Sequence, residues 1–174
     1  MSLKWDRKFL VMALDIADWS KDQSTKVGAV IVGPDNEVRS TGYNGMPRGV
    51  NDDVPGRHER PEKYFWFEHG ERNAIFQAAR MGTATKGCTL YVTSYPAKFG
   101  PCVDCARAII QVGIVRVVQE PLEGDAARWA ESFARTKQMF EEAGIQYDQV
   151  ALCDHPLDAR DMNICNACGK SDLK

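Results

Sequence analysis

Long apolar runs are missing from this chain of 174 residues. A helix that crosses a membrane needs about 20 consecutive apolar residues, so we expect no membrane partner. The first residues, Met1 to Trp5, also lack the apolar core of a secretion signal. We therefore expect a cytoplasmic protein.

A strong charge of either sign is missing as well. The formal net charge is -2 and the isoelectric point is about 5.9, so the chain as a whole has no attraction to phosphate backbones. Nucleic acid is therefore not an expected partner. The apolar content of 44% and the charged content of 26% are ordinary for a globular protein, and the length predicts one domain with its own core.

The placement of the cysteines argues against disulfide bonds. Four of the six fall into two C-x-x-C pairs, Cys102 with Cys105 and Cys165 with Cys168. Such pairs are typical of metal binding in a reducing compartment. Cys88 directly precedes a run with strand character and is expected in the core.

The segment from His69 to Cys105 carries the clearest chemical signal. One imidazole and two thiolates give zinc three protein ligands and leave its fourth position open, which is the catalytic arrangement. Cys102 and Cys105 are three apart, so at the start of a helix both sulfurs lie on one face. His69 and Glu71 are two apart, which would place them about 200° apart within a regular helix. The chain must therefore be only just entering a helix there, with Glu71 beside the open position.

Two short motifs in this segment form the signature of zinc-dependent deaminases, H-x-E followed by P-C-x-x-C. In that chemistry the glutamate carries protons as general acid and base. A lone C-x-x-C could instead be a redox pair or half of a structural zinc site, and a lone H-x-E occurs by chance. Together, the two motifs predict a catalytic zinc ion held by His69, Cys102 and Cys105, with Glu71 as the catalytic residue.

Hydrophobic periodicity predicts an alternation of helices and strands. The expected elements are helix 5–19, strands 27–32 and 38–43, helix 68–81, strand 89–93, helix 102–112, strand 114–118, helix 126–143 and strand 145–152. The first two strands form an antiparallel hairpin, whereas strands separated by a helix need a crossover and pair in parallel. The prediction is an α/β fold, a three-layer αβα sandwich with a five-stranded mixed sheet.

The region before the zinc motif is harder to interpret. Residues 44–63 contain three Gly and three Pro without a clear period, which predicts a long functional or mobile loop. Several polar or basic side chains lie in it, and each of them, taken alone, is expected to be a solvated surface group: Asn44, Arg48, Arg57, His58 and Arg60. The segment from Tyr64 to Phe67 is predicted to be a buried or interface patch. Helix 68–81 is apolar on nearly every side, which predicts burial between other layers.

The chain resembles the cytidine deaminase superfamily and, within it, the deoxycytidylate (dCMP) deaminases. The resemblance covers about residues 10 to 120. Beyond the zinc signature, it rests on Ser20-Lys21-Asp22, Thr25 to Val32 (TKVGAVIV), Gly42 to Gly49 (GYNGMPRG) and Asp52-Asp53. Nucleoside deaminases and tRNA adenosine deaminases share the zinc motif but lack the GYNGMPRG stretch.

The resemblance implies a cytidine deaminase-like sandwich, zinc on the three ligands already named, and Glu71 as the proton shuttle. It also implies that Asn44 contacts the sugar or base of a small-molecule nucleotide. Arg48, with Lys21 nearby, would help to hold the 5'-phosphate. Homo-oligomers are common in this branch, so a homo-oligomer is expected, and feedback by dNTPs is a further property that members often have.

Two departures from the family bear on the substrate. The family usually has His-Ala-Glu where this chain has Gly70, which removes a methyl group beside the expected base pocket. Ser94 to Gly100 is longer than the family's short turn, which normally frames the base. Gly70 and Ser94 are therefore expected to border the substrate. The side chains of the longer turn that would change which ring fits are Tyr95, Lys98 and Phe99.

The tail is a third departure from the family. We expect a zinc-dependent deaminase domain over residues 1–152 and a C-terminal tail over 153–174. Cysteine and histidine residues there form a Cys3His set for a second, structural zinc in a small knuckle: Cys153, His155, Cys165 and Cys168. The alternative is a loose tail with incidental cysteines.

The zinc motif predicts a hydrolytic deaminase, and the resemblance implies that it converts dCMP, or a closely related cytosine nucleotide, to dUMP and ammonia. Zinc would lower the pKa of water toward about 7, and Glu71 would pass the proton to the cytosine ring. A modified cytosine or another aminated heterocycle is an alternative substrate. A non-catalytic zinc-binding relative of the same fold is a further alternative, although a purely structural site has no use for Glu71.

Overall fold

The computed structural model describes residues 2–123 and 129–152. In chain order, its elements are α1 (Leu3–Ala17), β1 (Lys26–Val32), β2 (Val38–Tyr43), the 3-10 turn η1 (Pro55–Arg57), α2 (Lys63–Trp66), α3 (Gly70–Met81), β3 (Thr89–Tyr95), α4 (Val103–Gln111), β4 (Arg116–Gln119), α5 (Ala130–Glu142) and β5 (Gln146–Gln149). Each predicted helix and strand has a counterpart, whereas η1 and α2 lie in or beside the predicted loop. The proposed tail ligands lie outside the described residues.

The five strands form one mixed sheet in the order β2-β1-β3-β4-β5. The pairs β3/β4 and β4/β5 are parallel, as predicted for strands joined through a helix. β2 and β3 also run in the same direction, but the predicted pairing between them is wrong, because β1 lies between them and pairs with both in antiparallel fashion. The connection through α3 therefore carries the chain over β1 before it returns to the sheet.

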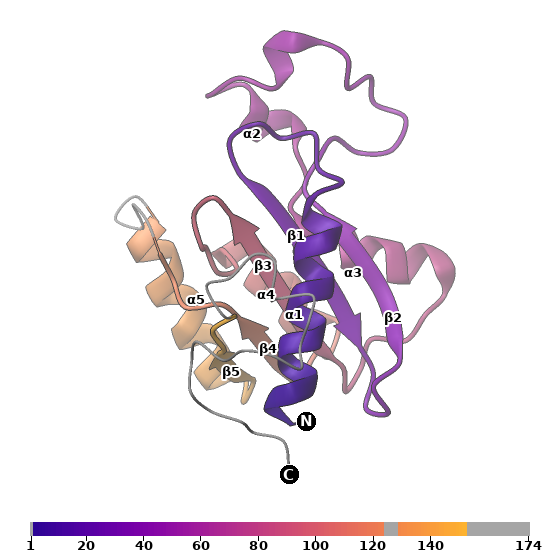
Figure 1. The fold of residues 1–174 in the computed structure, drawn as a ribbon, viewed down its shortest axis with the longest axis vertical. Helices are drawn as coiled ribbons and strands as arrows, with labels where there is room; N and C mark the ends of the chain where they lie inside the picture. Colours follow the sequence, from indigo (N-terminus) through magenta and orange to yellow (C-terminus); the bar gives the residue numbers. More distant parts are fainter. Residues whose placement is uncertain (1, 124–128, 153–174) are drawn as a thin grey trace, which may run out of the picture.

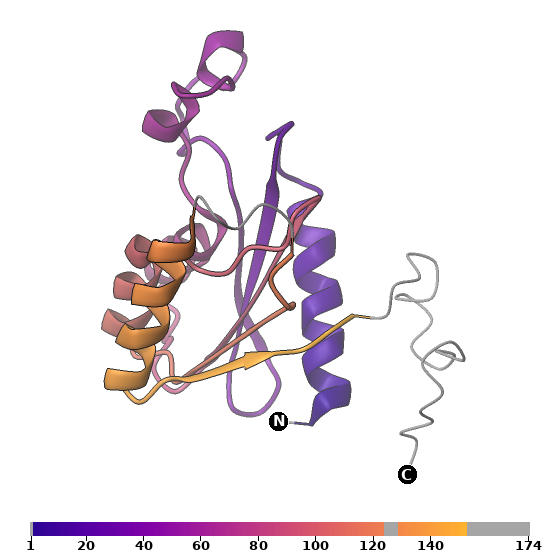
Figure 2. The same ribbon diagram turned by 90° about the vertical axis from the view of Figure 1, so that its left-hand side faces the viewer.

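Helices cover both faces of the sheet, which confirms the three-layer αβα sandwich. Figure 2 shows α1 alone on one face and α3, α4 and α5 together on the other. The core on the α1 side includes Leu10 and Val30, and the core on the opposite side includes Ile109 and Phe140. None of the described helices has the length and apolarity needed to span a bilayer.

Two glycines let helices approach the sheet backbone to backbone. A Cβ at Gly28 of β1 would lie 1.9 Å from the carbonyl oxygen of Ala13 in α1. A Cβ at Gly42 of β2 would lie 2.2 Å from the amide nitrogen of Ala74 in α3, on the other face. Neither gap admits a methyl group, so glycine is required at both strand positions.

The predicted burial of helix 68–81 on nearly every side is wrong, and of the two alternatives for Tyr64 to Phe67, a buried or an interface patch, burial is wrong for Phe65. α3 packs one face through Ala74 and Ala78, but Phe76 is 45% and Met81 is 67% exposed. The reason is that α3 lies in an outer layer and packs on its inner side against β1, β2, β3 and α4. Phe65 of α2 is 81% exposed, so this side chain is not buried, because α2 and its loop rise above the sheet (Figure 1).

A buried ionic network joins α1 to the sheet. Asp6 is 3% exposed and accepts hydrogen bonds from Arg116 Nη1 at 2.7 Å and from the Tyr91 hydroxyl at 2.7 Å. Arg116 Nε also donates to Asp148 at 2.7 Å. Burial alone would raise the pKa of Asp6, but the hydrogen bonds from Arg116 and Tyr91 hold that pKa below its ordinary value.

We expect Arg116→Met to lower the free energy of unfolding by about 3–5 kcal/mol at pH 7, because it leaves the Asp6 carboxylate buried without its cation. Urea unfolding measures the loss. Arg135→Met removes an exposed arginine paired with Glu131 on α5 and should cost less than about 1 kcal/mol. Because the folded-state pKa of Asp6 is lowered, its stabilisation is present above about pH 4 and is lost as the pH falls further. The difference between wild type and Arg116→Met should therefore shrink in acid.

Candidate metal centre and substrate cavity

Two helix starts supply the three predicted metal ligands. His69 is the N-cap residue of α3, with extended backbone (φ -79°, ψ 150°), so it precedes the regular helix as expected. Cys102 is the N-cap residue of α4, and Cys105 lies within the first turn of that helix. β3 runs between the two helices in sequence. The fold thus brings together ligands that are 36 residues apart in the chain.

The three donor atoms lie at distances that suit a tetrahedral zinc ion. All lie within 4.8 Å of one another. His69 Nδ1 is 3.5 Å from Cys102 Sγ and 3.4 Å from Cys105 Sγ. Zinc bonds of about 2.3 Å to sulfur and about 2.0 Å to nitrogen, at a tetrahedral angle, would separate these atoms by about 3.5 Å. The donor set therefore fits zinc in both chemistry and spacing.

The electrostatics of the three donors also favour a cation between them. Hydrogen bonding from the Cys105 thiol and from His69 lowers the pKa of Cys102 to about 3, despite partial burial. Hydrogen bonding to Cys102 raises the pKa of His69 to about 9. The neighbouring Cys102 thiolate and burial hold the pKa of Cys105 well above its ordinary value. A second thiolate is unfavourable there unless a positive ion joins the cluster.

Glu71 is a buried carboxyl group beside this cluster. It is the second residue of α3 and only 4% exposed. Burial raises its pKa, and the neighbouring His69 offsets part of that rise. A carboxyl group whose pKa moves toward neutrality is suited to accepting and returning a proton.

The cluster opens onto a cavity of about 130 Å³, on the order of ten times the volume that one water molecule needs. The cavity reaches from the metal donors to the segment around α2, and aromatic rings form much of its wall. Its lining residues are Asp22, Thr25, Val27, Asn44, Arg60, Lys63, Tyr64, Phe67, Glu68, His69, Glu71, Phe99, Gly100, Cys102, Trp129 and Phe133. The site thus has space for a small organic substrate next to Glu71.

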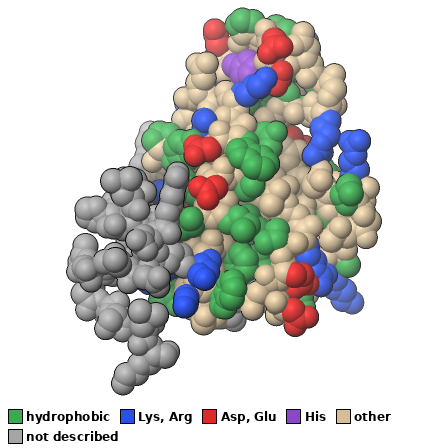
Figure 3. Space-filling view, turned by 45° about the vertical axis from the view of Figure 1, so that its right-hand side comes forward, with side chains coloured by type: hydrophobic (Ala, Val, Ile, Leu, Met, Phe, Trp, Pro, Cys, Tyr) green, Lys and Arg blue, Asp and Glu red, His purple; other side chains and the backbone are tan. Residues whose placement is uncertain are grey.

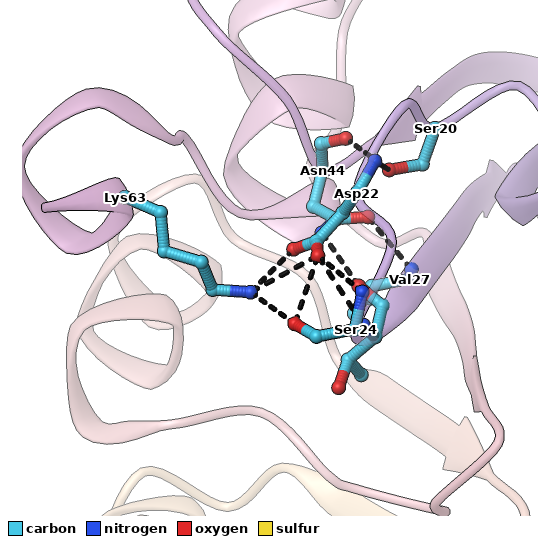
Figure 4. Close-up of polar contacts among 7 residues, drawn as sticks. Ser20, Asp22, Ser24, Val27, Asn44 and Lys63 are labelled. Atoms are coloured by element: carbon cyan, nitrogen blue, oxygen red, sulfur yellow. Dashed lines mark hydrogen bonds and ion pairs between the residues drawn. The ribbon is translucent and has the colours of Figure 1, made fainter. Parts of the chain in front are cut away.

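Asn44, predicted to contact the substrate, lines this cavity but is also held by the protein. Its side-chain oxygen accepts a hydrogen bond from the Val27 amide at 2.8 Å. Its side-chain nitrogen donates to Asp22 Oδ2 at 3.1 Å and to the Thr25 carbonyl at 2.9 Å (Figure 4). Both amide protons are therefore engaged, and a substrate donor would use the second lone pair of the oxygen. Its contact with sugar or base stays a prediction.

Other predicted substrate residues do not line the cavity. Lys21 is paired with Asp52 at 2.8 Å, and Arg48 donates to Gln77 at 2.6 Å. The Ser94 hydroxyl donates to the Ala97 carbonyl and accepts from the Phe99 amide, so it stabilises its own turn. A methyl group at position 70 would lie 3.0 Å from the Val27 carbonyl oxygen, and Gly70 does not line the cavity. The absence of this methyl group therefore does not widen the cavity. The substrate contacts of Lys21, Arg48, Ser94 and Gly70 stay predictions that this geometry does not support.

The longer turn after β3 contributes an aromatic wall. Phe99 lines the cavity and packs against Phe133 of α5 with ring centroids 6.3 Å apart. Tyr95 instead hydrogen-bonds Asp18, and Lys98 pairs with Glu120. Sequence reasoning missed Phe133 and Trp129 as residues of the site, because apolar residues near a helix start are usually assigned to the core.

Comparisons with known proteins identify the family. The sequence profile of the cytidine and deoxycytidylate deaminase zinc-binding region matches residues 3–120. The chain is 41% identical over 153 residues to an uncharacterized deaminase in the luxG 3' region of Aliivibrio fischeri, covering 87% of this chain and 97% of that protein. It is 35% identical over 150 residues to the deoxycytidylate deaminase of Homo sapiens, covering 83% and 79%. The dCMP deaminase of cyanophage S-TIM5, solved in complex with dCMP and dUMP, has the same fold, with a TM-score of 0.68 at 21% identity over 86% of this chain and 98% of that one.

The matched region contains all three metal donors and Glu71. The donor spacing fits zinc, and the matched family binds zinc through this region. The predicted zinc cofactor and the predicted deaminase activity are therefore confirmed at the level of the family. The chain belongs to the cytidine and deoxycytidylate deaminases and is a zinc-dependent hydrolytic deaminase.

Proposed function

We propose that the substrate is dCMP and that the products are dUMP and ammonia. The observation that carries this proposal is a buried carboxyl group, Glu71, placed beside a three-donor zinc centre at the wall of an aromatic-lined cavity. A flat, largely apolar ring with an exocyclic amine suits such a wall. Relatives named deoxycytidylate deaminase, at 35% identity, support the choice of cytosine nucleotide.

The proposed mechanism assigns proton transfer to Glu71. His69, Cys102 and Cys105 would hold Zn²⁺, which supplies Lewis acidity that lowers the pKa of water toward about 7. The Glu71 carboxylate removes a proton from water as the oxygen attacks C4 of the cytosine, and it delivers this proton to ring nitrogen N3. Glu71 then takes the remaining proton from the C4 hydroxyl and transfers it to the amine at C4. The C4–N bond breaks, ammonia leaves, and the oxygen remains as the C4 carbonyl.

One observation favours an alternative substrate. Phe99 comes from a turn that is longer than the family's and lies in the cavity wall, where it would contact the ring. A modified cytosine or another aminated heterocycle is therefore the second candidate. The reaction would be the same, because Glu71 and the metal donors act on the amine-bearing carbon and not on the rest of the ring.

Ammonia release from a panel of substrates tests the proposal. We expect zinc-loaded protein to release ammonia from dCMP much faster than from cytidine, deoxycytidine or single-stranded oligonucleotides. Preference for an aminated purine or triazine would favour the second candidate. Zinc-loaded protein that released ammonia from no compound in the panel would indicate a non-catalytic relative.

We also propose that the deaminase acts as a cytoplasmic homo-oligomer through its domain over residues 1–152. Several large hydrophobic side chains are exposed on the described part of the chain, among them Trp19 at 63% and Met81 at 67%. Figure 3 shows groups of hydrophobic side chains on one side of the molecule, which supports contact with further copies. Light scattering that gives a multiple of 19.4 kDa checks the assembly.

A further inference from the structure

Two cationic residues line the cavity in the segment that precedes the zinc motif, Arg60 and Lys63. This segment rises above the sheet together with α2 (Figure 1). A substrate whose reactive carbon lies at Glu71 would extend from the metal donors toward this part of the wall. The charges on this part of the wall would therefore face the end of the substrate that lies away from Glu71.

The charge of Lys63 is already neutralised within the protein. Lys63 is 6% exposed, and its Nζ lies 2.7 Å from Asp22 Oδ2 and 3.0 Å from Asp22 Oδ1. It also donates to the Ser24 hydroxyl at 2.5 Å, so all three ammonium protons have acceptors (Figure 4). Asp22 in turn holds the Asn44 amide. Lys63 therefore positions the loop that carries Asn44 and has no proton to offer a ligand.

Other cationic side chains near this loop are also engaged with protein groups. Apart from Arg60, the basic residues of the loop that the sequence analysis named, together with Lys21, each have a partner. Lys21 pairs with Asp52, Arg48 donates to Gln77, His58 contacts the Asp52 carbonyl, and Arg57 donates to the Asn51 carbonyl and lies 3.9 Å from the Trp66 ring. Of these four, none belongs to the cavity lining.

Arg60 is different. Within residues 2–123 and 129–152, its guanidinium has neither a hydrogen-bond acceptor nor a carboxylate partner, although it lines the cavity. The acidic groups near it are compensated, since Asp22 pairs with Lys63 and Glu68 lies 3.3 Å from Arg72 Nε. Away from the metal centre, the described lining therefore carries one uncompensated charge, and that charge is positive.

We propose that Arg60 binds the 5'-phosphate of the substrate and so makes the enzyme prefer a nucleoside monophosphate to the free nucleoside. The proposal rests on the proposed cytosine nucleotide function. A guanidinium offers two parallel N–H donors that match two oxygens of a phosphate group. Arg60 takes the role that the family resemblance implied for Lys21 and Arg48.

Kinetics of Arg60→Ala on two substrates test the proposal. A charge-assisted hydrogen bond contributes about 1.5–3 kcal/mol, so we expect kcat/KM for dCMP to fall about 10- to 100-fold, mainly through a rise in KM. The weaker turnover of deoxycytidine, which lacks the phosphate, should not change. Arg60→Lys keeps a positive charge without the fork and should recover part of the loss.

Arg80→Ala is the matched control. It removes an exposed arginine from the last turn of α3, roughly 14 Å along the helix from Glu71, and should leave both substrates unaffected. An equal loss on dCMP and deoxycytidine in Arg60→Ala would show that Arg60 acts on the fold and would overturn the proposal. The proposal would also be overturned if Arg60→Ala left the KM for dCMP unchanged. A raised KM for dCMP in Arg48→Ala or Lys21→Ala would then assign the phosphate to those residues.

Product binding separates failure of this inference from failure of the proposed function. By titration calorimetry, Arg60→Ala should bind dUMP about 10- to 100-fold more weakly than wild type and should bind deoxyuridine equally well. This measurement needs no turnover. Wild-type protein that released no ammonia from dCMP but lost dUMP affinity on Arg60→Ala would contradict only the reaction. Equal dUMP affinity in the two proteins would contradict the role of Arg60.

Discussion

Glu71→Ala is expected to keep its zinc and to lose nearly all turnover. General acid and base catalysis contributes about 100- to 10,000-fold, and Glu71 is assigned both proton transfers, so the fall in kcat should reach or exceed the upper part of that range. Zinc should stay, because His69, Cys102 and Cys105 supply the donors without the carboxylate. Steady-state ammonia release and metal analysis on the same preparation measure the two quantities.

Glu71→Gln separates chemistry from packing in this experiment. The amide keeps the size of the buried side chain, which is 4% exposed, but cannot accept and return a proton. Both variants should therefore be equally inactive. An active Glu71→Gln enzyme would assign proton transfer to another group, and an inactive Glu71→Ala enzyme without zinc would leave the loss explained by the metal alone.

Removal of zinc is expected to abolish activity and to lower the melting temperature. An ion that binds only the folded state stabilises it by about 2.7 kcal/mol at a hundredfold excess over its dissociation constant. For a chain of this length, that energy corresponds to a shift of about 5–11 °C. The ion would also link the start of α3 to the start of α4, because its ligands His69 and Cys105 are 36 residues apart in the chain. Dialysis against a chelator, followed by calorimetry and re-addition of zinc, measures both effects.

Cysteine variants show whether the effect belongs to this site. Cys105→Ala should lose one zinc ion relative to wild type, together with its activity, whatever the tail binds. Cys88→Ala is the matched control, because Cys88 is equally buried but lies in the core and outside the donor cluster. Zinc content that is unchanged in Cys105→Ala would contradict the assignment of the ligands.

Much of the metal centre could be predicted from the sequence because its determinants are local. The spacing of Cys102 and Cys105, and the two-residue step from His69 to Glu71, each require a helix start, and the structure has a helix start at both places. The strands and helices followed from periodicity for the same reason. The order of the strands did not, since the position of β1 between β2 and β3 depends on pairing between distant segments.

The substrate cavity could not be predicted in the same way. The ion pair of Lys63 with Asp22 joins residues 41 apart, and no spacing rule connects them. In the sequence, nothing distinguishes Arg60 from the other arginines of the loop. The difference appears only in the structure, where the others have protein partners and Arg60 has none among the described residues. The aromatic wall combines Phe99 from a turn with Phe133 from a helix that follows much later in the chain. Such sites depend on tertiary packing, which local patterns do not encode.

The close backbone contact at Gly42 of β2 limits which substitutions the metal centre can tolerate. At Gly42, a methyl group would meet both the Ala74 amide and, at 2.4 Å, the Gly70 carbonyl, which belongs to the residue between His69 and Glu71. The height above the sheet of the turn that carries His69 and Glu71 is thus fixed by main-chain atoms. Changes in side-chain volume elsewhere in the core can be absorbed by repacking without tilting this turn, whereas one added carbon at position 42 would lift a metal donor and the proton carrier together.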